Sequence, residues 1–497
     1  MFLQTLIASL LHKHVLGAPE AVEIRSITSN SKEVTAGSLF VAIVGNTVDG
    51  HTFLPEVCDK GAVAVLVERA CEDLPNHVVQ IVVPSTRKAV AIVASVFYRQ
   101  PSKEMKVIGV TGTNGKTTTT HLIEKVLSDC GFTTGLIGTI HMRIGQEVID
   151  VANTTPEALE LQKTFRTMCD RNTTYCIMEV SSHALELYRV AGTHFRTAIF
   201  TNLTQDHLDF HGTMEQYRNA KGKFFSRLGN TYEDSTEKQS FAVINRDDPH
   251  AEFFLAQTVA PTITYGIDQP SDVRALDVHI TAEGVFFRLE TFAGSAAVQL
   301  RLTGKFSVYN ALAAIAACLI ESIPLPAILH SLEQVDNVPG RFEKVEEGQP
   351  FTVIVDYSHT PDSLENALKT IQEFAKGKIW TVVGCGGDRD RSKRPIMAKI
   401  AATYSDTAIL TSDNPRTEDP DRILDDMEAG LQEIPNLNYF RLADRKQAIR
   451  YAIEHADPSD CILIAGKGHE TYQIIGKTKY HFDDREIARS VIRGMGQ

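Results

Sequence analysis

A glycine-rich loop between a strand-like run and a helix-like run constrains this chain more than any other feature. The run KVIGV at residues 106–110 is short and β-branched, as buried parallel strands are. The segment TGTNGKT follows at residues 111–117, and a helical pattern then extends from Thr118 to Cys130 and stops at Gly131. A strand, a tight turn and a helix in this order present backbone N–H groups and a helix N-terminus to an anion. We therefore predict a phosphate-binding loop within an α/β fold.

The residues of this loop have the chemistry that a nucleoside triphosphate requires. Lys116 would reach the outer phosphates, and the hydroxyl of Thr117 would ligate Mg²⁺. The strict Walker spacing would place a glycine where this chain has Val110, so the loop is a variant, G-x-x-G-K-T. A glycine-rich turn without a ligand is the alternative, and the strand–loop–helix context argues against it. The predicted ATP contacts of the loop are Gly112, Thr113, Asn114, Gly115, Lys116, Thr117 and Thr118.

The length of the chain predicts several domains. At 497 residues it exceeds what one ordinary core supports. Strand-like and helix-like runs alternate, so we expect an α/β protein of three domains: a small N-terminal α/β domain (1–100), a central P-loop doubly wound ATPase domain (101–335) and a C-terminal Rossmann-like domain (336–497). Strands are predicted at 38–44, 62–67, 106–110, 175–180, 197–202, 241–245, 351–355, 379–383, 407–410 and 461–465, and helices at 3–11, 118–130 and 311–319.

Composition excludes several classes of function. The net charge of −12 argues against a nucleic-acid partner, because such partners reward a basic face. The 8 cysteines are scattered with no C-x-x-C pair, so we expect core thiols in a reducing cytoplasm rather than a zinc site or disulfides. No apolar run approaches the roughly 20 residues that span a membrane. The N-terminal run from Leu3 to Leu11 lacks a basic start and a cleavage site, which favours an amphipathic helix over a signal peptide.

Two strand ends supply candidate metal ligands. Glu179 lies in MEVSSH at residues 178–183, and the segment DHLDFH at 206–211 includes His207. Carboxylates and imidazoles at the carboxyl ends of parallel strands are placed as ligands are in α/β folds. Taken alone, Glu179 could instead be a solvated charge, and DHLDFH could be a polar surface loop.

These segments resemble the ATP-dependent Mur ligases of peptidoglycan synthesis. The shared segments occur in the family's order and cover essentially the whole chain, and the likeness is greatest to members that add the third peptide residue. The motifs are TGTNGKT (111–117), EVSSH (179–183), TNLTQDHLDFH (201–211), NALAA (310–314), PGRFE (339–343), DYSHTPD (356–362) and GCGGDRD (384–390).

The resemblance implies a reaction and its substrates. ATP would phosphorylate the γ-carboxylate of the D-glutamate in UDP-N-acetylmuramoyl-L-alanyl-D-glutamate, and an amine would then displace phosphate from the acyl phosphate. Catalysis of this kind is mostly positioning and charge neutralisation. We expect meso-diaminopimelate as the amine, a cytoplasmic monomer, and neither a nucleic-acid nor a membrane partner.

The resemblance also implies roles near the phosphates. Lys116 and Thr117 would hold ATP and Mg²⁺, with Glu179 and His207 as further metal ligands. Lys221 matches a lysine that family members carbamylate, and the carbamate would favour a second Mg²⁺; from its own pattern Lys221 reads only as a helical surface lysine. The matching nucleotide contacts are Asn310, Arg341, Asp356 and His359, with Ser358 standing where alanine is usual.

The nucleotide-sugar peptide would contact the first half of the chain. By resemblance, the uridine pocket comprises Ser31, Asn46, Thr47 and Val48. The muramoyl-peptide contacts would be Asn153, Thr154, Thr155, Ser181 and Arg189. The chain departs from the pattern at Leu187, where some relatives have glutamine, so no contact is assigned there.

The segment DNPR at residues 413–416 bears on which amino acid is added. By resemblance, diaminopimelate-adding ligases carry DNPR, whereas lysine-adding ligases usually lack its arginine. The guanidinium of Arg416 matches the second carboxylate of diaminopimelate as a bidentate fork, and it would repel the ammonium of lysine. The segment could also be only a turn after a strand, which is compatible with a site. The predicted acceptor pocket contains Arg389, Asp413, Asn414, Pro415, Arg416, Gly466 and Glu470.

Three alternatives stay open from the sequence. A sibling ligase that adds L-lysine, or a folylpolyglutamate synthetase, would use the same chemistry; Arg416 and the predicted uridine pocket argue against both. A regulatory or motor ATPase would hydrolyse ATP without an acceptor. A binding module without activity is disfavoured because Lys116, Thr117 and Lys221 are all present.

Overall fold

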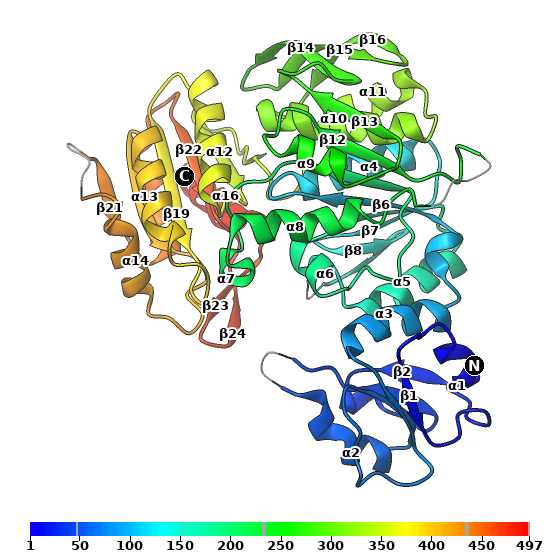
Figure 1. Cartoon of the computed structure of the whole chain (residues 1–497). Helices are drawn as coiled ribbons and strands as arrows, with labels where there is room; N and C mark the ends of the chain where they lie inside the picture. Colours follow the sequence, from blue (N-terminus) through cyan, green and yellow to red (C-terminus); the bar gives the residue numbers. More distant parts are fainter. Residues whose placement is uncertain (46–47, 152, 231–234, 433–436, 496–497) are drawn as a thin grey trace. The chain divides into compact units, whose positions relative to one another are not determined.

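The computed structural model describes residues 1–45, 48–151, 153–230, 235–432 and 437–495. They fall into two compact units, one from the ranges Met1–Gly109 and Phe132–Thr197 and the other from Val110–Gly131 and Ala198–Gln497. Figure 1 shows the helices and strands along the chain. Within the described residues, none of the helices combines the length and the apolar character that a membrane crossing requires.

The first unit begins with a small α/β sheet. Its strands run in the order β1-β5-β4-β3-β2, and only β1 is antiparallel to its neighbour. The strand AVAVLV is buried on both faces, as an inner parallel strand must be when helices cover both sides. The elements are α1 (Leu3–Ile7), β1 (His14–Leu16), β2 (Ser26–Thr28), β3 (Ser38–Val41), α2 (Leu54–Asp59), β4 (Ala62–Val67), β5 (Val79–Val82) and α3 (Thr86–Phe97).

The rest of the first unit surrounds strand β10, which ends at Glu179. Strand β7 is parallel to β10, and β8 and β9 add an antiparallel edge. The apolar stripe of helix α5 packs Leu161, Phe165 and Met168 into the interior. The elements are β7 (Thr134–Ile137), β8 (Met142–Ile144), β9 (Glu147–Ile149), α5 (Ala158–Asp170), β10 (Tyr175–Glu179) and α6 (Ser182–Glu186).

The second unit carries the helix that follows the phosphate loop. Helix α4 packs against α10, which is alanine-rich and buried along almost its whole length. Strands β12 to β14 are parallel, and β14, β15 and β16 form an antiparallel meander. The elements are β6 (Lys106–Thr111), which starts in the first unit, α4 (Lys116–Asp129), β11 (Thr197–Phe200), α7 (Leu208–His211), α8 (Met214–Phe225), β12 (Phe241–Asn245), α9 (Ala251–Ala256), β13 (Thr262–Gly266), β14 (Val273–Ile280), β15 (Val285–Thr291), β16 (Gly294–Leu300), α10 (Lys305–Ile320) and α11 (Leu325–Glu333).

A six-stranded sheet follows within the same unit, in the order β17-β18-β22-β19-β20-β21. Apart from the short β17, its neighbouring strands are parallel. The elements are β17 (Glu343–Lys344), β18 (Thr352–Asp356), α12 (Pro361–Phe374), β19 (Ile379–Cys385), α13 (Lys393–Tyr404), β20 (Thr407–Ser412), α14 (Pro420–Glu428), β21 (Tyr439–Arg441), α15 (Arg445–Glu454), β22 (Cys461–Ala465), the hairpin β23 (Tyr472–Ile475) with β24 (Thr478–His481), and α16 (Asp484–Met495).

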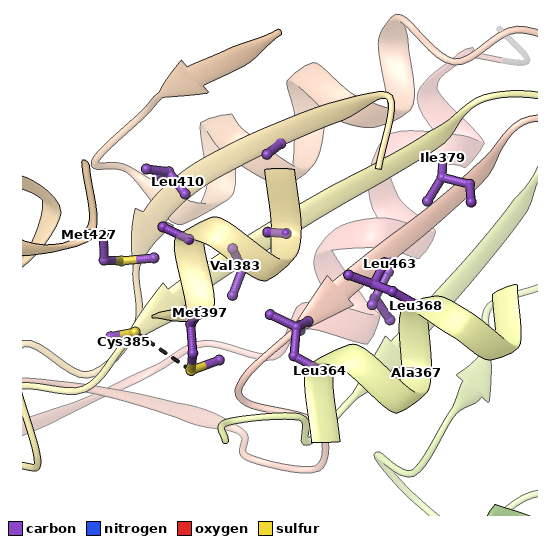
Figure 2. Close-up of a cluster of buried hydrophobic side chains, with 14 of the residues drawn as sticks. Leu364, Ala367, Leu368, Ile379, Val383, Cys385, Met397, Leu410, Met427 and Leu463 are labelled. Atoms are coloured by element: carbon purple, nitrogen blue, oxygen red, sulfur yellow. Dashed lines mark hydrogen bonds between the residues drawn. The ribbon is translucent and has the colours of Figure 1, made fainter. Parts of the chain in front are cut away.

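Alternate residues of the central strand β19 face two apolar layers. Val383 and Cys385 point to one side, where Leu364 and Leu368 of α12 and Met397 of α13 cover them (Figure 2). On the other face, Trp380 and Val382 pack with residues of α15 and α16. This period-2 burial under helices on both faces is that of a doubly wound sheet.

The structure confirms the α/β class and corrects some elements. Predicted strands 62–67, 241–245 and 461–465 have the observed bounds, whereas the N-terminal helix ends at Ile7 rather than Leu11. The meander β14–β16 was not predicted. Five cysteines are the expected core thiols, while Cys71, Cys130 and Cys169 are only half-buried. The domain bounds 1–100, 101–335 and 336–497 stay a prediction.

Candidate active site

Close packing around two glycines fixes the conformation of the phosphate loop. Gly112 and Gly115 have φ of +148° and +85°, and a Cβ at either position would overlap the side chains of Thr201 or Asn310. The backbone N–H of Thr113 donates to the carbonyl of Asn202 at 2.8 Å. These contacts fix the loop just before α4, so the N-terminus of that helix is available for an anion.

The two polar residues at the start of α4 are engaged within the second unit. The ammonium of Lys116 donates to the carbonyls of Gly112 (3.0 Å) and Thr113 (2.7 Å). The hydroxyl of Thr117 accepts a hydrogen bond from Arg341 Nη2 at 2.7 Å. Arg341, predicted as a nucleotide contact, is therefore brought to the predicted metal-ligating hydroxyl.

Lys221 of α8 is buried beneath the same loop, at 1% exposure. Its ammonium donates to Gly112 O at 2.7 Å and lies 4.5 Å from the ring centroid of Tyr217. Burial, together with the positive charge of Lys116, lowers the pKa of Lys221 well below its usual range. The pattern-based interpretation of Lys221 as a surface lysine is therefore wrong, and the role that the resemblance implies for Lys221 stays a prediction.

Asp206 and His207 lie between β11 and α8. His207 adopts a left-handed backbone with φ +55°, and its Nε2 is 3.2 Å from Asp206 Oδ2. Burial would raise the pKa of Asp206, but electrostatic interactions with His207, His359 and Lys393 hold it below its usual range. Asp206, which belongs to the DHLDFH segment of candidate ligands, is thus an anionic carboxylate beside the predicted ligand His207.

A cavity of about 400 Å³ lies next to the phosphate loop. This volume is within the range of small-molecule sites. The lining includes the predicted contacts Asn114, Gly115, Thr118, Asn310, Arg341 and Asp356, and further residues that sequence reasoning missed, among them Asn245, Asp247, Tyr309 and Asp362. Most of the predicted nucleotide contacts of this unit therefore share one cavity.

His359 lies close to this group but is not part of the cavity lining. Its Nδ1 donates to Tyr357 O at 2.9 Å, and burial together with Lys393 lowers its pKa to about 4. The imidazole is neutral at physiological pH. Asp356 accepts from the backbone N–H of Phe342 at 2.7 Å, which ties the end of β18 to the Arg341 segment.

Asp362, at the start of α12, joins the six-stranded-sheet region to the phosphate loop. Its Oδ2 accepts from Asn114 Nδ2 at 2.8 Å and from the hydroxyl of Thr204 at 3.2 Å. Burial raises the pKa of this carboxyl. Asp362 belongs to the DYSHTPD segment, but its spacing alone gave no signal of this contact.

In the first unit, Glu179 is a buried acceptor. Its carboxylate accepts from the backbone N–H (2.8 Å) and the hydroxyl (3.0 Å) of Thr139. The hydroxyl of Thr155 donates to Glu179 O at 2.8 Å and accepts from Ser181 N at 3.1 Å. Arg189 Nη1 donates to Thr155 O at 2.9 Å. The predicted muramoyl-peptide contacts Thr155, Ser181 and Arg189 thus form one cluster around Glu179.

The remaining predicted contacts of this unit are nearer the surface. The hydroxyl of Thr154 lies 3.1 Å from that of Thr139, and Asn153 is exposed beside it. Ser31 opens a 3-10 turn, and Val48 is 53% exposed. Asn46 and Thr47 lie outside the described residues.

The predicted acceptor residues gather at the carboxyl ends of β19, β20 and β22. The register pairs Cys385 with Ser412 and Val383 with Ala465, so the loops after these strands emerge at one edge. A Cβ on Gly466 would lie 2.7 Å from Asp413 Oδ2, so the glycine allows the two loops to approach. Asn414 Nδ2 donates to Glu470 Oε2 at 2.8 Å.

The guanidinium of Arg416 is half-buried near that of Arg389. Its Nη1 donates to Gly387 O at 2.8 Å. Burial and the positive charge of Arg389 lower the pKa of Arg416. The carboxylates of Asp413, Glu470 and Asp388 oppose this shift, and Arg389 itself is exposed. A partly desolvated guanidinium beside another cation favours a bound anion.

The hairpin β23–β24 holds the DNPR loop. Arg416 N donates to Ile474 O (3.0 Å), and Gly476 N donates to Arg416 O (2.7 Å). Ile474 N donates to Asn414 Oδ1 at 2.9 Å. These bonds keep Arg416 in a left-handed conformation with φ +52°, which a side chain other than glycine adopts only when its surroundings impose it. The hairpin therefore holds the DNPR loop in place, and the role of this loop in binding stays a prediction.

A strand–glycine loop–helix segment beside a nucleotide-sized cavity defines a P-loop ATP-binding enzyme, here with a second α/β sheet behind the cavity. Family models match 23–98 (Mur ligase family, catalytic domain), 110–318 (Mur ligase middle domain) and 340–468 (Mur ligase, glutamate ligase domain). The chain belongs to the Mur ligase family, whose members are ATP-dependent.

Two curated relatives cover nearly the full chain, and both are named UDP-N-acetylmuramoyl-L-alanyl-D-glutamate--2,6-diaminopimelate ligase. The protein of Geobacillus thermodenitrificans is 52% identical over 99% of both chains, and that of Oceanobacillus iheyensis is 47% identical over 100% of both. A solved structure titled as that ligase matches with a TM-score of 0.71 and 32% identity, covering 100% of this chain and 99% of its own. MurF ligase from Thermotoga maritima, solved in complex with ADP, shares the fold at 18% identity, a TM-score of 0.62, and 96% and 97% coverage.

Proposed function

We propose that this chain uses ATP to join meso-diaminopimelate to the γ-carboxylate of the D-glutamate in UDP-N-acetylmuramoyl-L-alanyl-D-glutamate, a step of peptidoglycan synthesis. The names of the full-length relatives support the reaction. The observation that carries the choice of amino acid is the paired placement of Arg416 with Arg389, and of Glu470 with Asn414, in one loop cluster.

The acceptor loops have complementary charges for diaminopimelate. Arg416 and Arg389 would take the carboxylate at its far end as a charge-assisted pair, and Glu470 would take the neighbouring ammonium. Asp413, Asn414 and Gly466 would line the same pocket, and Pro415 would stiffen its loop. Lysine has no second carboxylate, so the two guanidiniums would be left without an anion.

The phosphate loop would bind ATP and polarise its γ-phosphate. Lys116 would turn from the carbonyls of Gly112 and Thr113 to the outer phosphates, and Arg341 would turn from Thr117 to the nucleotide. A carboxylate is a poor electrophile because its leaving group would be oxide; transfer of the phosphoryl group gives it a good one. The amine then attacks the acyl carbon and phosphate departs, with the chain supplying alignment and positive charge.

The residues proposed to hold Mg²⁺ are Thr117, Glu179, His207 and Lys221. Hydroxyl and carboxylate oxygens with one imidazole are a donor set of the kind that magnesium accepts. Among the described residues, no group of three or more His, Cys, Asp or Glu gathers as a metal site by itself. Phosphate oxygens of ATP would therefore complete the coordination, as is usual for this ion. Bound there, Mg²⁺, in two copies by our proposal, would neutralise charge on the phosphates.

Lys221 is proposed to carry a carbamate formed from CO₂. Only an unprotonated amine reacts with CO₂, and the buried Lys221 has a strongly lowered pKa, which supports that form. The carbamate would convert a buried cation into an anionic oxygen ligand.

The remaining contacts follow the family's pattern. Asn310, Asp356 and His359 would surround the adenosine part of ATP. Ser31, Asn46, Thr47 and Val48 of the N-terminal region (1–100) would hold uridine, and Asn153, Thr154, Thr155, Ser181 and Arg189 the muramoyl peptide. We propose the central region (101–335) as the ATPase domain and the last (336–497) as the amino-acid domain of a cytoplasmic monomer.

One assay tests this function. The protein is incubated with ATP, Mg²⁺ and UDP-N-acetylmuramoyl-L-alanyl-D-glutamate, together with either meso-diaminopimelate or L-lysine, and products are read by mass. A tripeptide product with diaminopimelate and not lysine is expected. Product with lysine alone would contradict the proposed specificity, and ATP turnover that ignores the nucleotide-sugar peptide would indicate a regulatory ATPase instead.

A further inference from the structure

Lys467 is a buried cation that the proposed reaction does not use. It follows Gly466 at the carboxyl end of β22, and its side chain is 0% exposed. An ammonium removed from water is costly unless charged and polar groups surround it closely. The groups that contact Lys467 must therefore offset the cost of burying its charge.

The contacts of Lys467 are the acceptor residues themselves. Its ammonium lies 3.0 Å from Glu470 Oε2 and 3.3 Å from Asn414 Oδ1. Asn414 in turn donates from Nδ2 to the same Glu470 oxygen at 2.8 Å. The three side chains form a closed triangle in which both contacts to the carboxylate engage Oε2. This arrangement orients the carboxylate and leaves Oε1 as the oxygen for an incoming ammonium.

The same triangle acts on the charge of Glu470, whose pKa lies above its usual range. Burial raises the pKa of Glu470, and so does the carboxylate of Asp413, whereas Lys467 and Asn414 lower it. A protonated Glu470 could not pair with an ammonium. Lys467 is thus the cation in direct contact that opposes protonation.

Other charged or titratable groups also face Glu470. They bear on any titration measured there because each interacts electrostatically with this carboxyl. They are Asp413, Arg416, Arg445, Tyr357 and Tyr472.

We propose that Lys467 is a positioning residue for amino-acid selection: it keeps Glu470 ionised and turned toward the amine substrate without touching that substrate. The inference rests on the proposed function, since it takes Glu470 as the partner of the distal ammonium. Arg445 and Asp484 hold the end of strand β22 in place. Arg445 Nη2 donates to Ala465 O at 2.9 Å and to Asp484 Oδ2 at 2.7 Å.

The primary test is Lys467→Met, which keeps a long unbranched side chain and removes its charge. The KM for diaminopimelate should rise by about tenfold or more at pH 7, while KM values for ATP and the nucleotide-sugar peptide change by less than about twofold. The loss in the variant should become smaller as the pH is raised, because an unsupported Glu470 is ionised to a greater extent at higher pH. The wild type should show no such recovery.

Lys479→Met is the matched control. Lys467 and Lys479 both lie over the ring of Tyr472, at 5.5 Å and 4.2 Å, but Lys479 is on the exposed strand β24. This control should behave as wild type. An unchanged diaminopimelate KM in Lys467→Met, equal rises for all three substrates, or a pH-independent loss would overturn the proposal.

A double variant keeps the test decisive if Lys467→Met folds poorly. Lys467→Met with Glu470→Gln removes both buried charges, so neither is left unpaired. If Lys467 acts through Glu470, the double variant should have the diaminopimelate KM of Glu470→Gln alone, and a further large rise would contradict that route. A wild type that accepts only lysine would refute the proposed function separately; the same variants would then be measured with lysine, whose ammonium meets the same carboxylate.

Discussion

The hydrogen bonds of Lys116 bear on how the phosphate loop would bind ATP. In the described structure its ammonium is bound to two carbonyls of its own loop, Gly112 O and Thr113 O. Those carbonyls compete weakly with a triphosphate, because charge-assisted bonds to phosphate are stronger than bonds to neutral oxygens. The side chain is therefore poised to exchange partners when ATP binds.

Replacing Lys116 by alanine should abolish turnover and leave the fold intact. The variant loses a cation aimed at the transferring phosphoryl group, and loss of one such stabilising group costs on the order of 10²–10³-fold in kcat. Product formation and thermal unfolding would be measured together. Substantial remaining activity would contradict the assignment of the loop, whereas loss of cooperative unfolding would make Lys116 structural.

Local motifs explain which residues the sequence could identify. The phosphate loop is contiguous, so spacing alone predicted Gly112 to Thr117. Lys221 was recognisable only by resemblance, because a helix pattern does not reveal that α8 packs this lysine under Gly112. Asp362 lay inside the recognised DYSHTPD segment, and Lys467 lay between the predicted pocket residues Gly466 and Glu470. Their contacts with Asn114 and Glu470 nevertheless depend on tertiary packing. Burial of a charged side chain has no signature in one sequence when its partner comes from another loop.

At the scale of elements, the buried strands were predictable and the antiparallel ones were not. Runs such as AVAVLV and CILIA are apolar without interruption because helices cover both faces of their sheets. Strand β15 alternates buried and exposed residues, and β14 and β16 do so only in part, so the meander β14–β16 contains no continuous apolar run. The hairpin β23–β24 is mostly exposed. The hairpin nevertheless positions the acceptor loop.

The contribution of Arg416 to diaminopimelate binding should depend on the planar geometry of its guanidinium as well as on its charge. Arg416→Ala should raise the KM for diaminopimelate far more than the KM for ATP. The loss of one charged pair should cost about 2–5 kcal/mol of binding free energy. Arg416→Lys keeps the charge but loses the planar fork, so we expect most of the loss to remain. Steady-state KM values for each substrate measure this. Equal effects on both substrates would count against a role in specificity.

At the scale of the whole molecule, the second unit joins the phosphate loop to the region that holds the amino-acid pocket. Arg341 contacts Thr117, and Asp362 contacts Asn114 and Thr204. These bonds connect two regions that are far apart in sequence, across the cavity proposed for ATP. A ligase of this chemistry needs such a connection, because the acyl phosphate must meet the amine before water does.

Asp362→Ala should weaken that connection. Its carboxylate accepts from Asn114 and Thr204, so we expect a fall in kcat of about tenfold, since alignment of the loop with the acceptor region is lost. Stability should fall by about 1 kcal/mol, because two half-buried donors lose their acceptor. Glu365→Ala is the control: it removes a carboxylate from the same helix α12, where Glu365 pairs with Lys369 rather than with the phosphate loop. Product formation and denaturant unfolding would be measured for both variants. If Glu365→Ala lowers kcat as much as Asp362→Ala, the effect belongs to the helix as a whole, and the contact with Asn114 does not couple the two regions.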